Sequence, residues 1–195
     1  MKKFLKELYL PLLFTAVAVS GLVLGCISVS RADEKTLDFL SLLTGGFVQS
    51  SASVSEHFFS AVGSDFIMLF ILYFLGFLLF SYPFSALLVL FCGVGVGVSV
   101  GFLFRTYGVN SILYSAVLIA PSASVSILTL IFASCESVKM TTFLFKRCFF
   151  KDALPLNREK FTKYSLQFLS FSCILVLSGI LDTALNRIFS SIIIL

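Results

Sequence analysis

The chain has 195 residues, of which 58% are hydrophobic and only 12% are charged, and its mean hydropathy is +1.06. A water-soluble domain of this size cannot bury so much apolar surface. The 14 basic and 10 acidic residues gather mainly at 2–7, 31–38 and 136–163, which leaves long uncharged runs between them. This distribution predicts a polytopic membrane protein. It excludes a secreted disulfide scaffold, a disordered tail and a protein that binds nucleic acid.

The uncharged runs predict an all-α fold, a helix bundle that crosses the membrane five times and forms one membrane domain over 1–195. One crossing needs about 20 apolar residues. The run at 66–104 is long enough for two, and we expect a break at Ser81-Tyr82-Pro83 because proline disfavours helix at and before its position. The predicted spans are 8–30, 66–82, 84–104, 111–135 and 165–185. They leave a segment at 31–65 and a basic loop at 136–163.

The basic residues predict the orientation of these spans. Ten Lys and Arg residues lie before the first span or in the 136–163 loop, whereas four lie on the other side. Because Lys and Arg accumulate on the cytoplasmic side, we expect a multi-pass protein of the cell membrane with a cytoplasmic N-terminus and an external C-terminus. The 136–163 loop is then cytoplasmic and favours anionic lipid headgroups of the bilayer, and the 31–65 segment is external.

The first apolar run admits a second interpretation, a cleavable signal peptide at 1–32 with small residues around its end. The uncharged run at 8–30 has 23 residues, whereas the apolar region of a signal peptide has about 7–15. The length therefore favours a membrane anchor over a cleaved signal.

Small residues recur at helical spacing in the third predicted span. Gly93, Gly97 and Gly101 form two overlapping GxxxG steps, and the first span adds Gly21 and Gly25. Small residues at this spacing let two helix backbones approach closely. Two alternatives stay open, which are packing within one chain and the pairing of two copies in a homo-oligomer.

Polar residues follow one face of the fourth predicted span, at Ser115, Ser122, Ser126, Thr129 and Glu136. Such a stripe is typical of a water-filled path, or of hydroxyl groups that hydrogen-bond between helices and to their own backbone. The second interpretation is favoured because we expect Glu136 at the cytoplasmic interface, where a charge costs little. In the fifth span, Asp182 is expected near the outer interface as an interhelical hydrogen-bonding residue.

Residues for catalysis or metal binding are scarce in this sequence. The only histidine, His57, has no nucleophile elbow or HExxH around it, and the five cysteines form no CxxC pair. A Walker A motif is also absent. We therefore expect no catalytic residue, no metal and no cofactor.

The order of glycines and prolines resembles that of the stage II sporulation protein M family. The residues that carry the resemblance are Gly76, Pro83, Gly93, Gly97, Gly101, Gly108 and Pro121. Short members of this family are similar to the chain in length and number of spans. The resemblance implies a non-catalytic membrane scaffold that recruits or anchors peptidoglycan-degrading partners at the sporulation septum for forespore engulfment. The alternative is a permease-like subunit of a membrane transporter, with the fourth-span stripe as part of its path.

Overall fold

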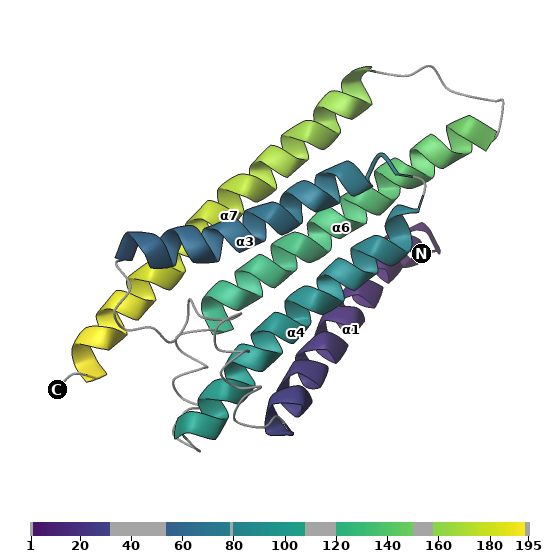
Figure 1. The fold of residues 1–195 in the computed structure, drawn as a ribbon. Coiled ribbons are helices and arrows are strands. Elements are labelled where there is room, and N and C mark those ends of the chain that lie inside the picture. The colour runs from purple at the N-terminus through teal and green to yellow at the C-terminus, as the bar shows by residue number, and fades with distance from the viewer. Residues whose placement is uncertain (1, 32–53, 79, 108–119, 150–157, 194–195) are drawn as a thin grey trace.

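The computed structural model is an elongated bundle of α-helices (Figure 1). It describes residues 2–31, 54–78, 80–107, 120–149 and 158–193. The helices in these ranges are α1 (Lys2–Ser30), α3 (Val54–Leu75), α4 (Ser81–Tyr107), α6 (Ala120–Phe149) and α7 (Arg158–Ile193). The N-terminus, the α3–α4 turn and the consecutive ends of α6 and α7 lie at one end of the bundle, and the C-terminus lies at the other (Figure 1). The predicted all-α class is confirmed for the described residues.

Four of the described helices are long and apolar enough to cross a membrane. These stretches are Tyr9–Ser30, Ser81–Arg105, Ala120–Lys146 and Arg158–Leu185, and a shorter apolar stretch covers Val62–Leu75 of α3. Large apolar side chains point outward from all five described helices, among them Leu12, Ile67, Phe70, Leu87, Phe91, Phe132, Leu169 and Leu177. An outer surface of this kind suits hydrocarbon rather than water. The protein is therefore an integral membrane protein.

The boundary between α3 and α4 lies earlier than the predicted spans 66–82 and 84–104 place it. Helix α3 begins at Val54, inside the segment expected to be external, and it ends at Leu75, seven residues before the predicted end of the span. The chain then turns, with the Gly76 amide bonded to the Leu72 carbonyl at 3.2 Å. Helix α4 begins at Ser81, so Pro83 lies in its first turn, where the missing amide hydrogen has no intrahelical partner to lose. Pro83 therefore helps to start a helix and does not end one.

The basic segment at 136–163 is helical over much of its length, where a loop was expected. Helix α6 continues to Phe149, and α7 already begins at Arg158. Lys, Arg and Glu are good helix formers whose charged ends reach water. A helix can therefore continue beyond the apolar stretch that crosses the membrane. Residues 111–119 of the predicted fourth span lie outside the described residues.

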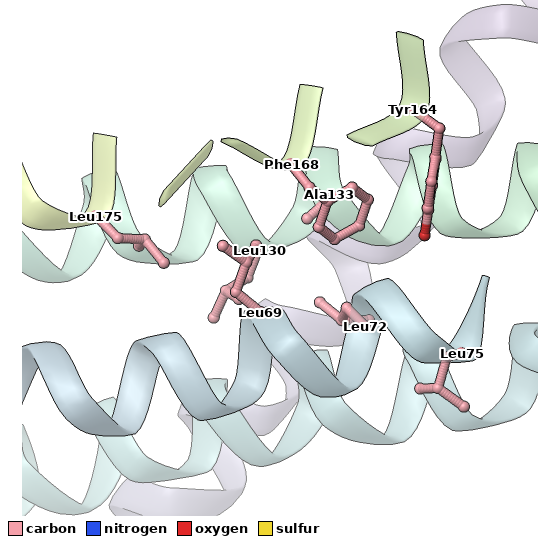
Figure 2. Packing of buried hydrophobic residues seen from close by; sticks show 8 residues of the cluster. All are labelled: Leu69, Leu72, Leu75, Leu130, Ala133, Tyr164, Phe168 and Leu175. Carbon is pink, nitrogen blue, oxygen red and sulfur yellow. The ribbon is translucent and has the colours of Figure 1, made fainter. Parts of the chain in front are cut away.

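Helix α6 is the central element of the bundle and contacts each of the other four described helices. Half of its most apolar stretch is buried, against 28% for each of the other three long candidate spans. One buried cluster joins α6 to α3 and α7, and Figure 2 shows Leu69 of α3 lying against Leu130 of α6, with Phe168 of α7 nearby. A second cluster joins α6 to α1 and α4 through Phe14, Val89 and Ile131. Several polar side chains of α6, among them Ser122, Thr129 and Ser137, are also buried among these neighbours.

Candidate functional site: an acid and serine cluster between helices

A network of short polar contacts joins α6 to α7 inside the bundle. The Ser122 hydroxyl donates a 2.8 Å hydrogen bond to Oδ1 of Asp182. One turn before Asp182, the Ser178 hydroxyl donates to the Ser122 carbonyl at 3.0 Å and lies 3.2 Å from the Ser126 hydroxyl. Asp182 is only 4% exposed. The predicted interhelical role of Asp182 therefore has a specific geometry, in which a carboxylate of α7 accepts from a serine of α6.

A second carboxylate, that of Asp65 on α3, completes this group. The Ser126 side chain and the Asp182 carboxylate are both near enough to the Asp65 carboxylate to interact with it electrostatically. We call Asp65, Ser122, Ser126, Ser178 and Asp182 the acid and serine cluster. It links three helices, and it places two acidic side chains together in the interior of a membrane protein, where charges are costly and commonly have a role.

Asp65 is the member that sequence reasoning missed, because it lies in the segment predicted to be external. A signal for it was nevertheless present in the sequence. Asp65 precedes Leu69 and Leu72 by four and seven residues, and both leucines are almost fully buried. That spacing places the three side chains on one helix face. A predicted helix that began before residue 66 would have placed Asp65 on the buried face, together with Leu69 and Leu72.

The predicted polar stripe of the fourth span is divided among different surroundings. Ser122 and Ser126 belong to the cluster, whereas the Thr129 hydroxyl donates back to the Val125 carbonyl of its own helix at 2.7 Å. Glu136 lies further along α6, where it pairs with Lys139 at 2.7 Å. Ser115 lies outside the described residues. The described part of the stripe thus supplies contacts between helices and within α6.

Hydroxyl groups of α6 and α7 hold the turn between α3 and α4. The Thr141 hydroxyl donates to the Gly76 carbonyl at 3.0 Å, and the Tyr164 hydroxyl donates to the Tyr73 carbonyl at 2.9 Å. A side chain at Gly76 would collide with the Tyr164 hydroxyl. These bonds satisfy carbonyls at the end of α3, which a helix terminus otherwise leaves open. Gly76 is therefore small because Tyr164 occupies the adjacent space.

The glycines of α4 lie against α1 of the same chain. A Cβ added at Gly97 would collide with the Leu22 carbonyl oxygen, and one added at Gly93 would meet that of Ala18. The Cys26 thiol donates to the Gly97 carbonyl at 3.3 Å. By contrast, a Cβ at Gly95 would meet no atom within 4 Å. The glycines of α4 therefore pack against a helix of the same chain, which is the first of the two alternatives left open by the sequence.

The two glycines of α1 take part in the same contact with α4. Gly21 and Gly25 of α1 lie against the backbone of Leu90 and Val94 of α4. Gly101 lies at the end of the same seam, where an added Cβ would be 3.2 Å from Cβ of Val29. Pro121, expected near the middle of a helix, lies in the first turn of α6 as described. Gly108 lies outside the described residues.

Groups that could hold a metal ion are absent from the described part of the chain, where no three His, Cys, Asp or Glu side chains come together. The five cysteines, all within the described ranges, are free thiols. The acid and serine cluster offers two carboxylates and three hydroxyls. Its chemistry is hydrogen bonding between helices and, at most, the holding of a proton or a small cation.

Comparisons with known proteins identify the family of the chain. The family model for stage II sporulation protein M matches residues 13–185. No curated protein and no solved structure matches the chain. The matched region begins inside α1 and ends three residues after Asp182, so it contains the α1–α4 glycine contacts and the acid and serine cluster. The chain therefore belongs to the stage II sporulation protein M family, and it is a membrane protein of that sporulation family.

Proposed function

We propose that this protein is a non-catalytic membrane scaffold that recruits or anchors peptidoglycan-degrading partners at the sporulation septum during forespore engulfment. The observation that carries the proposal is the use of the polar residues of α6. The described hydroxyls at Ser122 and Ser126 bond to α7, and that of Thr141 bonds to the end of α3 and the turn after it. Polar side chains that bond between helices hold a bundle in one arrangement. A fixed bundle suits a protein that positions partners.

The orientation of the scaffold is part of the same proposal. We infer a cytoplasmic N-terminus, an external segment at 31–53 and a cytoplasmic connection between α6 and α7, from the distribution of Lys and Arg. The start of α1, the end of α6 and the start of α7 lie at the same end of the bundle, which is compatible with this orientation (Figure 1). The external segment is then the largest part of the chain available to wall enzymes.

Affinity capture tests the recruitment role. The tagged full-length protein is purified from membranes of sporulating cells, and its partners are identified by mass spectrometry. The test variant replaces Leu37, Leu40 and Phe47 of the external segment by serine. A matched control replaces Leu154 and Leu156, in the connection on the other side, by serine. We expect peptidoglycan hydrolases with the wild type and the control but not with the test variant. Their absence from the wild type would reject the proposal.

A second candidate function, a permease-like subunit of a transporter, is favoured by one observation. Asp65 and Asp182 interact within the bundle, and carboxylates inside membrane proteins commonly bind protons or cations on a transport path. This candidate predicts a co-purifying ATPase or a loss of function when the two charges are removed. The same capture experiment detects the first outcome, and the last experiment of the Discussion detects the second.

A further inference from the structure

A groove of about 380 Å³ lies between α6 and α7 at the end of the bundle that holds the α3–α4 turn. Its walls come from one face of each helix. They are Glu136, Lys139, Met140 and Phe143 of α6 and Lys160, Lys163, Tyr164 and Gln167 of α7. The groove is separate from the acid and serine cluster, which lies more than two turns away from Glu136 along α6.

The groove is basic. Three lysines and one glutamate line it, so their formal charges sum to +2. Lys139 pairs with Glu136 at 2.7 Å, which leaves the charges of Lys160 and Lys163 to face the open groove. These two residues are three positions apart on α7 and therefore lie on the same helix face. The Lys160 ammonium also lies 4.1 Å from the centre of the Phe143 ring, which holds it over the groove.

The groove also lies at the level of a membrane interface. Tyr164, one of its walls, bonds through its hydroxyl to the Tyr73 carbonyl at 2.9 Å, at the end of the apolar stretch of α3. The apolar stretch of α3 ends at Leu75 and that of α4 begins at Ser81, on either side of the turn next to Tyr164. A turn between two such stretches belongs at the membrane interface, which is the depth of the lipid phosphates. Met140, Phe143 and the Tyr164 ring supply an apolar wall beside the lysines.

We propose that this groove binds the phosphate headgroup of an anionic phospholipid. Lys160 and Lys163 contact the phosphate, and the upper part of an acyl chain lies against Met140 and Phe143. Basic pockets between membrane helices at a charged interface are suited to such headgroups. A membrane lipid is the occupant that the position favours, because a lipid brings its phosphate and its apolar chain together at this depth. The assignment does not depend on which leaflet the groove faces.

Lipid binding by the purified full-length protein tests this assignment. Native mass spectrometry in detergent measures the binding of phosphatidylglycerol, with phosphatidylcholine as the zwitterionic comparison. The test variant is Lys160→Gln with Lys163→Gln. The matched control, Lys146→Gln with Arg158→Gln, removes two exposed charges from the same two helices outside the groove. We expect the affinity for phosphatidylglycerol to fall about thirtyfold in the test variant, since each lysine near an anionic lipid contributes about fivefold.

Three further measurements complete the test. Lys160→Arg with Lys163→Arg keeps both charges and should retain binding. An equal loss of affinity in the matched control would show general attraction to basic residues and overturn the site. Inorganic phosphate that competes fully with the lipid would make the groove a site for free phosphate. Poly-glutamate that binds more tightly than the lipid would make it a site for an acidic protein segment. Either result overturns the lipid assignment.

Discussion

Ser122 on α6 and Asp182 on α7 form a short polar link between these two helices, at 2.8 Å. The Ser178 hydroxyl returns a bond of 3.0 Å to the Ser122 carbonyl, so the two helices are joined in both directions. Both Ser122 and Asp182 are buried. A reciprocal contact of this kind fixes the register of one helix against the other, since a shift by one residue would break both bonds.

Replacement of Ser122 by alanine should therefore destabilise the protein. The Asp182 carboxylate would lose a hydrogen-bond donor in a buried position, at a cost of about 1–3 kcal/mol. The measurement is thermal unfolding of the purified protein in detergent. Ser124→Ala is the matched control, because the Ser124 hydroxyl is exposed and donates to the Pro121 carbonyl of its own helix. Equal stability of the two variants would contradict the role of the Ser122 bond.

Gly97→Ala should destabilise the seam between α1 and α4, whereas Gly95→Ala should be tolerated. The added Cβ at Gly97 would collide with the backbone of Leu22, and the one at Gly95 would meet no atom within 4 Å. Forcing two packed helices apart costs about 1–3 kcal/mol. Unfolding temperature and abundance in the membrane report the difference. If both variants behave like the wild type, α1 and α4 are not in close backbone contact.

Tyr164→Phe should weaken the turn between α3 and α4. The change keeps the ring and its stacking on Tyr73, with ring centres 5.4 Å apart, but it removes the hydroxyl that donates to the Tyr73 carbonyl. We expect a loss of about 0.5–1.5 kcal/mol in stability. Tyr82→Phe, at an exposed position of α4, serves as the control. A loss of similar size in the control would show that the effect is not specific to the turn.

Cys148 offers a test of orientation without a new cysteine. It is exposed near the end of α6, on the side predicted to be cytoplasmic. A membrane-impermeant maleimide should not label it in intact cells but should label it in inverted membrane vesicles. Cys148→Ala identifies the signal. Labelling in intact cells that disappears in Cys148→Ala would show that this end of the bundle is external.

The sequence predicted the helical class, the membrane and the small-residue seam, because each depends on local composition and spacing. The uncharged runs located the apolar part of each helix, and the spacing of Gly93, Gly97 and Gly101 marked the face that meets another helix. The identity of that partner was open, because spacing does not specify which helix lies opposite. The structure assigns it to α1.

The ends of the helices and the full polar cluster were not predicted, for a common physical reason. A charged residue predicts the end of a span, but Asp65 lies inside the bundle, where the Ser126 side chain interacts with it. A hydropathy argument counts the charge and does not see the hydrogen-bond donor that another helix supplies. Glu136 was likewise taken as the end of a span, although α6 continues to Phe149.

The proposal that this protein is a scaffold is tested most directly by removing the two carboxylates of the acid and serine cluster. Asp65→Asn with Asp182→Asn keeps a hydrogen-bond acceptor for Ser126 and Ser122 and removes both charges. A scaffold needs the helix contacts, whereas a transporter coupled to protons or cations needs at least one of the acids. The measurement is the fraction of sporulating cells that complete engulfment, together with the abundance of the protein in the membrane. The scaffold account predicts near-normal engulfment at near-normal abundance. Loss of engulfment by a variant that accumulates normally and still captures its partners would contradict it and favour transport.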